Sequence, residues 1–242
     1  MTITYVGGKT GGGDNADIPL TVSLTDLTGG SDSAPAADDL VVVTLAFGYA
    51  GFPVVGSIKN ASSVDYTTNS AYGADVRDCT CCVGYRLMPG TPETSVVLDS
   101  ASSIWKFTYT IHVYRGVSTS SPMDATATVA DNINTMMANP PAITPVTFGA
   151  WIHVAGAAGV GTAAVFTSSP LTAFLSTYRS GGDASVVGAG YFAGWSYGAY
   201  DPAAFTSTGP DNADFSWAAV TLALRPAVPT VRVGGVFFGS NF

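Results

Sequence analysis

Glutamate and lysine are almost missing from this chain of 242 residues. The one glutamate is Glu93, the three lysines are Lys9, Lys59 and Lys106, and only 11% of all residues are charged. Both residue types are strong helix formers on protein surfaces. Threonine, valine, serine, alanine and glycine take their place, which favours strands over helices. The sequence therefore predicts an all-β protein with less than about 10% helix.

Positive charge is also scarce, and no run of lysine or arginine occurs anywhere in the chain. The formal net charge is −8 and the pI is near 4.3. A surface that follows nucleic-acid phosphates needs clustered basic residues. We therefore expect no nucleic-acid partner. The sequence shows no basic-then-apolar leader and no apolar run of about 18 residues, so we also expect no membrane partner and no standard secretion signal.

Cysteine is rare and confined to one segment, RDCTCCVGYRLM, which holds Cys79, Cys81 and Cys82. Neighbours this close along a strand do not form relaxed disulfides with one another. A metal site needs further ligands at suitable spacing, and no second cysteine or cysteine–histidine cluster exists. We expect three buried free thiols in a protein made in a reducing cytoplasm, with no metal and no cofactor.

What the chain does contain is a series of short apolar or alternating segments between clusters of Gly, Pro, Asp and Ser. Residues 105–114 alternate clearly, so one face, with Trp105, Phe107, Tyr109, Ile111 and Val113, is expected to be buried and the other wetter. No segment has a sustained helical period that would supply crossover helices. About ten strands in an antiparallel two-sheet sandwich, jelly-roll-like, are the expected fold.

We expect three regions along the chain. Residues 1–17 form an N-terminal arm and a flexible Gly-rich linker, residues 18–226 a single β-sandwich domain, and residues 227–242 an apolar C-terminal tail. Within the domain, residues 123–145 have no strand character and are interpreted as a long connection. The tail carries Phe237, Phe238 and Phe242, which are unlikely to stay in water; it either folds back as an edge strand or docks into a partner.

The glycine-rich stretch TYVGGKTGGG, residues 4–13, raises the question of a phosphate-binding loop. Such a loop needs a glycine five residues before its Gly-Lys pair, a buried strand upstream and a helix downstream. Ile3 occupies the glycine position, and the segment IPLTVSLT that follows is typical of a strand. The stretch therefore predicts a linker and not a nucleotide site.

The candidate catalytic residues do not form a recognisable constellation, and we expect no enzyme activity. GWSYG matches the nucleophile pattern G-x-S-x-G around Ser196, but no helix follows it, and His112 and His153 both precede the serine. Each histidine lies mid-strand without a nearby acid, which favours a structural role. Paired carboxylates for glycoside hydrolysis are absent, since the aspartates cluster in turns.

The tetrapeptide Asp-Asn-Ala-Asp occurs twice, at residues 14–17 and 211–214. Two carboxylates and an amide in one turn could hold calcium if further oxygen ligands converge there. Turn formation alone also explains both copies and is the preferred interpretation.

An aromatic cluster, YFAGWSYGAYDPAAF, surrounds several glycines late in the chain. Rings exposed on a sandwich rim could stack on sugars, which makes host-surface glycan a candidate ligand. Alternating aromatics that pack into the core are the other reading. The candidate glycan-binding residues are Tyr191, Trp195, Tyr197 and Tyr200.

Several phrases taken together resemble one known family: YVGGKTGGG, IPLTVSLT, SAPAADDLVVV, HVYRGV with SPMDATAT, NPPAITPV, FTSS and SWAAVTLALRPA. They are similar to virion-associated β-sandwich structural proteins of tailed bacteriophages and prophages, and the resemblance extends to about residue 226. It implies a non-enzymatic role on the virion surface as a capsid decoration, head fibre or tail appendage, made in the host bacterial cytoplasm. Implied partners are other virion proteins and further copies of the chain, for example in a trimer; a receptor- or glycan-binding adhesin is the alternative.

Overall fold

The computed structural model describes residues 2–48, 53–54, 56–101, 106–161, 163–181 and 184–228. Its fifteen strands form antiparallel pairs, and the expected all-β sandwich is confirmed. The one helical element in these ranges is a single 3-10 turn, η1 (Asn15–Asp17). None of the described helical structure has the length and apolar character needed to cross a bilayer.

Each half of the chain supplies one of the two large sheets. The central sheet has the order β1-β8-β3-β6-β5. Its strands are β1 (Thr4–Asp14), β3 (Leu40–Gly48), β5 (Thr67–Gly73), β6 (Cys79–Leu87) and β8 (Lys106–Arg115). The second sheet has the order β12-β13-β10-β15-β9. Its strands are β9 (Thr128–Ile133), β10 (Ala150–Val160), β12 (Thr172–Arg179), β13 (Ala184–Trp195) and β15 (Ser216–Leu224). This connectivity differs from a jelly roll, in which strands pass repeatedly from one sheet to the other.

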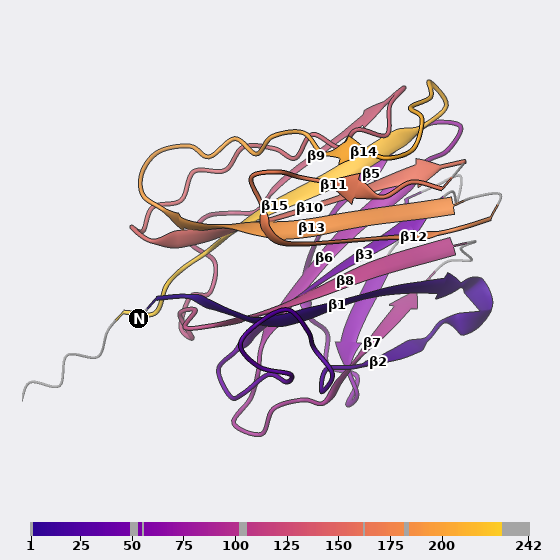
Figure 1. The fold of residues 1–242 in the computed structure, drawn as a ribbon. Helices are drawn as coiled ribbons and strands as arrows, with labels where there is room; N and C mark the ends of the chain where they lie inside the picture. The colour runs from indigo at the N-terminus through magenta and orange to yellow at the C-terminus, as the bar shows by residue number, and fades with distance from the viewer. Residues whose placement is uncertain are drawn as a thin grey trace, which may run out of the picture.

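Two smaller sheets cover the outer faces of this sandwich, so the molecule is layered (Figure 1). The outer sheet, order β2-β7-β4, lies against the central sheet; its strands are β2 (Leu20–Ser23), β4 (Gly56–Asn60) and β7 (Ser95–Ser100). The pair β11 (Phe166–Thr167) and β14 (Thr206–Ser207), together with loop residues such as Met136 and Phe205, covers the second sheet. The central strands of both large sheets are therefore buried on both faces.

Burial on both faces explains strands such as β3, LVVVTLAFG, whose residues are all buried. It also corrects the expectation that β8 has one wetter face. Phe107, Tyr109, Ile111 and Val113 do pack toward the outer sheet, but Thr108, Thr110, His112 and Tyr114 are buried as well, because the second sheet covers them. Trp105 lies outside the described residues.

The glycine-rich segment is not a flexible linker, and the expectation for residues 1–17 is wrong on this point. Thr4 pairs with Arg115 and Asp14 with Lys106, so β1 runs along β8 over its whole length. Glycine is required because the strand is crowded. A Cβ on Gly8 would collide with the Tyr5 hydroxyl and lie 2.6 Å from the Ile111 carbonyl oxygen. Lys9, the candidate phosphate ligand, forms an ion pair with Asp26 instead.

The connection expected at residues 123–145 contains a strand that the sequence did not reveal. Residues of β9 pair with β15, with Ser216 opposite Ile133 and Thr221 opposite Thr128. The segment TVADNI lacks a clear alternation of apolar and polar residues. Most of its side chains are exposed because β9 is an edge strand. Its pairing partner, and not its own sequence, makes it a strand.

Candidate functional site

The aromatic residues predicted to bind glycan do not form one exposed row. Tyr191 is buried between the large sheets, where its ring stacks on Trp151 with centroids 4.4 Å apart and an interplanar angle of 13°. Tyr200 is buried too, and Trp195 is half-buried against it with centroids 4.9 Å apart. Of the four candidates, only Tyr197 has an exposed side chain, at 80%. The core-packing interpretation therefore holds for Tyr191 and Tyr200.

Tyr197 has an exposed aromatic neighbour that the sequence analysis missed. Phe148 is 69% exposed, and its ring centroid lies 6.0 Å from that of Tyr197. The signal available in the sequence was Phe148 beside Gly149, because Gly149 adopts φ 82° in the turn that begins β10. Phe148 and Tyr197 together are called the exposed aromatic pair below.

An apolar pocket of about 450 Å³ lies next to the exposed aromatic pair. Phe148 and Trp151 provide its aromatic walls, Thr2 and Thr147 contribute side chains with hydroxyl groups, and Val228 lines it where the described chain ends. A sugar needs several fixed polar partners, and this lining offers few of them. The pocket is better suited to an apolar side chain.

The rim of the pocket is held rigidly by a buried carboxylate, Asp124. Its Oδ2 accepts hydrogen bonds from the backbone N–H groups of Val146 and Thr147, at 2.7 and 2.8 Å, and its Oδ1 accepts one from Arg225 Nε at 3.0 Å. Burial opposes ionisation, but these bonds outweigh it and lower the pKa of Asp124 below its usual value. A pocket with a preformed rim loses less entropy when it binds.

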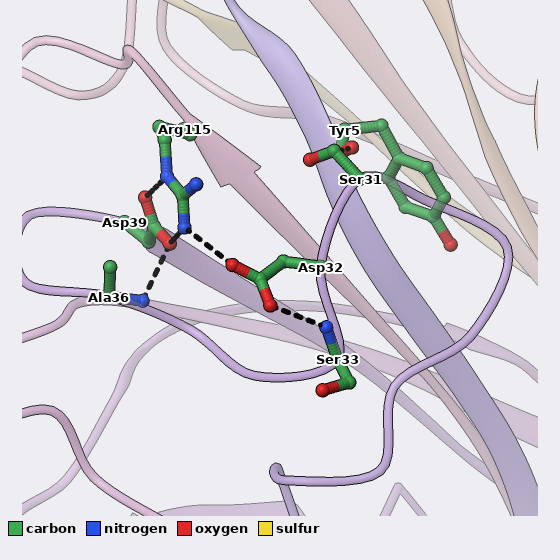
Figure 2. Close-up of polar contacts among 7 residues, drawn as sticks. All are labelled: Tyr5, Ser31, Asp32, Ser33, Ala36, Asp39 and Arg115. Carbon is green, nitrogen blue, oxygen red and sulfur yellow. Dashed lines mark hydrogen bonds and ion pairs between the residues drawn. The ribbon is translucent and has the colours of Figure 1, made fainter.

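A second cavity, of about 380 Å³, shares Ala227 and Val228 with the first and is lined by Asp38, Asp39 and Arg115. Figure 2 shows the polar network beside it. Asp39 is 1% exposed and accepts hydrogen bonds from Arg115 Nε and Nη2, both at 2.9 Å, while Asp32 lies 3.8 Å from Nη2. Asp38, which also lines the cavity, is exposed. Two carboxylates, Asp39 and Asp32, flank the one guanidinium, and Asp38 adds a third negative charge to the region.

The predicted docking residues Phe237, Phe238 and Phe242 lie outside the described residues. The structure does show the position from which their segment starts. Ala227 N–H donates to the Gly116 carbonyl oxygen at 2.8 Å, and Ala227 and Val228 line both cavities. The described chain therefore ends where the apolar pocket and the acidic cavity meet. We call this end of the sandwich the two-cavity end.

The two histidines lie in the core and do not contact Ser196. His112 Nε2–H donates to the Ala173 carbonyl oxygen at 3.1 Å, and His153 Nδ1 shares a hydrogen bond of 2.8 Å with the Tyr114 hydroxyl. Burial lowers the pKa of His112 to about 4 and holds that of His153 well below its usual value. Ser196 is exposed on the turn after β13. A serine nucleophile here has neither histidine as its base.

The remaining candidate groups also have structural partners. Cys79, Cys81 and Cys82 are buried free thiols, as expected, and burial raises the pKa of each. Asp14 binds Arg179 and Lys106, both at 2.9 Å, and these partners lower its pKa to about 2. In the second Asp-Asn-Ala-Asp copy, Asp211 accepts hydrogen bonds from residues 135 and 136. Within the described ranges, no group of three or more His, Cys, Asp or Glu is arranged to hold a metal ion.

The fold and the site thus define an all-β sandwich protein with an apolar pocket and an acidic cavity at one end. No family model, curated protein or solved structure matches the chain. Its function must be inferred from its own residues and geometry.

Proposed function

We propose that this chain is a non-enzymatic structural protein of a phage virion, carried on the particle surface as a capsid decoration, head fibre or tail appendage. The observation that carries the proposal is the two-cavity end: an apolar pocket beside an exposed aromatic pair and an acidic cavity both include Val228, after which the sequence continues into a Phe-rich segment. Exposed apolar surface of this kind is typical of sites that contact other proteins. The resemblance of the chain to virion sandwich proteins supports the same role.

The distribution of reactive groups supports a non-enzymatic role. Both histidines and all three cysteines are buried, and burial keeps the histidines neutral and the thiols protonated. General acid–base or nucleophilic catalysis needs such groups at an accessible surface with pKa values near the working pH. In the described chain these residues act as packing groups.

The partners we propose are other virion proteins, from capsid or tail, and further copies of the chain in a symmetric assembly such as a trimer. The test is to purify particles from the strain that encodes the chain on a density gradient and to probe the fractions with an antibody. We expect the chain to co-sediment with the particles, while an abundant cytoplasmic protein, probed as the control, stays at the top. A chain found only with the cytoplasmic control would contradict the proposal.

A receptor- or glycan-binding adhesin on the same particle is the second candidate function, and the exposed aromatic pair is the observation that favours it. Tyr197 and Phe148 are the rings free to stack on a sugar. If this candidate holds, Tyr197→Ala should lose retention on immobilised host-surface polysaccharide and keep its melting temperature. Retention by the variant equal to that of the wild type would reject the adhesin role for this pair.

A further inference from the structure

Four buried polar atoms between the two large sheets have no hydrogen-bond partner within the described chain. They are Thr44 Oγ1 on β3, Thr110 Oγ1 and His112 Nδ1 on β8, and His153 Nε2 on β10. All four residues are 0% exposed. A buried polar atom that stays unpaired destabilises the folded state, because it has given up its hydrogen bonds to water. Most such atoms in folded proteins therefore have a partner, either in the protein or in an ordered water.

The alternation of the strands places these four atoms in one region. Thr44 lies on the same face of β3 as Ala46, which belongs to the core cluster between the two large sheets. Thr110 pairs with Thr44 across β8 and β3. Thr110 is also two residues from His112, whose ring lies 5.1 Å, between centroids, from the ring of His153. We call these four side chains the inter-sheet polar cluster.

Direct hydrogen bonds join the two sheets on both sides of this cluster. Thr108 of β8 shares a hydrogen bond of 2.9 Å with Ser185 of β13. Tyr114, at the other end of β8, shares one of 2.8 Å with His153 of β10. The unpaired atoms of β8 come from residues between these two bonds. The interface between the sheets is therefore polar along this stretch, and only its middle part lacks partners for its polar atoms.

The hydrogen bond of His112 limits what can pair with it. Its Nε2–H donates to the Ala173 carbonyl oxygen at 3.1 Å, and a carbonyl oxygen can only accept. Burial lowers the pKa of His112 to about 4, so the ring is neutral at pH 7 and Nδ1 carries a lone pair that needs a donor. His153 Nε2 is a donor or an acceptor, depending on the proton it shares with Tyr114. A partner for the whole cluster must therefore both donate and accept.

The second sheet contributes small side chains to this part of the interface. Ala155 lies on the same face of β10 as His153, two residues further along, and pairs with Ala189 of β13. Both alanines are buried in the core cluster between the large sheets. Facing sheets lie about 10 Å apart, and alanine spans less of that distance than leucine or phenylalanine. Small neighbours and several polar partners are what a buried water requires.

We infer that the inter-sheet polar cluster is a binding site for one ordered water molecule, which bridges the central sheet and the second sheet. The water donates one hydrogen bond to His112 Nδ1. Its other three bonds go to His153 Nε2 and the hydroxyls of Thr44 and Thr110, which can donate or accept as the tautomer of His153 requires. A buried water commonly makes two to four hydrogen bonds. The inference goes beyond the proposed virion role and does not depend on it.

A crystal structure of the full chain, at a resolution that shows ordered waters, tests the site directly. We expect an electron-density peak for one water at about 2.7–3.2 Å from His112 Nδ1 and at a similar distance from at least one of the two threonine hydroxyls. Continuous packing of side chains through this region, with no such peak, would overturn the inference. A direct hydrogen bond from a protein group to His112 Nδ1 would overturn it as well.

The melting temperatures of two matched variants provide an independent test. Thr110→Val keeps the shape of the side chain and removes a hydroxyl, so the water loses a partner and the variant should melt about 2–4 °C below the wild type. Thr221→Val is the control, because the Thr221 hydroxyl is equally buried and unpaired but lies outside the cluster. Thr221 pairs with Val154, which belongs to a different core cluster.

The two variants should shift the melting temperature differently. Replacing a buried hydroxyl that has no partner by a methyl group removes an unpaired polar atom, so Thr221→Val should melt at or above the temperature of the wild type. If Thr110→Val also melts at or above that temperature, its hydroxyl has no water partner and the inference is wrong. Equal losses in both variants would overturn it too, because the loss would then not depend on the cluster.

Discussion

His112 of the central sheet and His153 of the second sheet meet edge to face, with ring centroids 5.1 Å apart and an interplanar angle of 74°. Both rings are 0% exposed. Two imidazole rings this close together in the core do not destabilise the folded state while both are neutral. A protonated ring would lose its hydration in the core, and two protonated rings would repel each other. The interface between the two large sheets is therefore sensitive to acid.

We predict that stability falls between pH 6.5 and about 4. An unfolded histidine has a pKa near 6.5, while burial lowers the folded pKa of His112 to about 4 and that of His153 in the same direction. Below pH 6.5 the unfolded chain takes up protons that the folded chain does not, so at pH 5 each histidine should cost about 2 kcal/mol of unfolding free energy. Urea denaturation at pH 7 and pH 5 measures this.

The control for this prediction is the pH slope of His112→Gln. Whatever its stability at pH 7, it should lose about half the slope between pH 6.5 and 5. Carboxylates with lowered pKa values, such as Asp14 at about 2, lose their contribution at lower pH and do not enter this window. A wild type equally stable at pH 7 and 5 would show that the pair tolerates protonation.

The Asp39–Arg115 pair should matter far more than its neighbour Asp32. Asp39 is buried and bound by two charge-assisted hydrogen bonds, so Asp39→Asn should lower the free energy of unfolding by about 2 kcal/mol. Asp32 is half exposed and 3.8 Å from the guanidinium, so Asp32→Asn should cost less than about 0.5 kcal/mol. Chemical denaturation of both variants compares them, and equal losses would contradict this ranking.

Gly8→Ala should destabilise the fold by about 1–3 kcal/mol, because a Cβ there overlaps Tyr5 and lies 2.7 Å from Leu175 Cδ1. Gly90 is the matched control, since a Cβ at that position meets no atom within 4 Å and Gly90→Ala should be neutral or slightly stabilising. Differential scanning calorimetry gives both melting temperatures. If Gly8→Ala melts at the same temperature as the wild type, β1 does not pack as tightly against Tyr5 and Leu175 as these contacts indicate.

The loss of stability on removing a tyrosine from the aromatic cluster should depend on how deeply its ring is buried. Tyr200→Ala removes a buried ring packed on Trp195 and should cost about 3 kcal/mol, whereas Tyr197→Ala removes an exposed one and should leave the melting temperature within about 1 °C. Thermal denaturation followed by tyrosine fluorescence separates the two. A similar loss for both would mean that the turn around Tyr197 carries stability of its own.

The composition of the chain was enough to predict strands, antiparallel sheets and a sandwich, because the helix-forming residues are missing. It could not predict that the central strands of both large sheets are covered on both faces. Thr108 and Thr110 look like solvent-facing residues in an alternating strand, and only the second half of the chain, folded against them, makes them interior. The prediction for the glycine-rich strand β1 was wrong for a related reason. Its glycines leave space for close contacts with β8, which is distant in sequence.

The candidate site was only partly predictable. Tyr197 was one of four rings for which the sequence left exposure and core packing open, and Phe148, which lies about 50 residues earlier, joins it only through the turn before β10. The apolar pocket combines residues from both ends of the described chain, such as Thr2 and Val228, with the turn at Phe148. No local sequence pattern predicts a site that is assembled from segments so far apart in the chain.

The pairing of β1 with β8 also sets an order of events during synthesis. The strand at residues 4–14 leaves the ribosome before its partner, residues 106–115, which emerges only after most of the central sheet. In that interval β1 is an unpaired strand, the kind of element that nucleates aggregation. Its five glycines give the strand little apolar surface and give the unfolded segment a high conformational entropy. The residues that fit the crowded native position therefore also reduce the tendency of the nascent segment to aggregate.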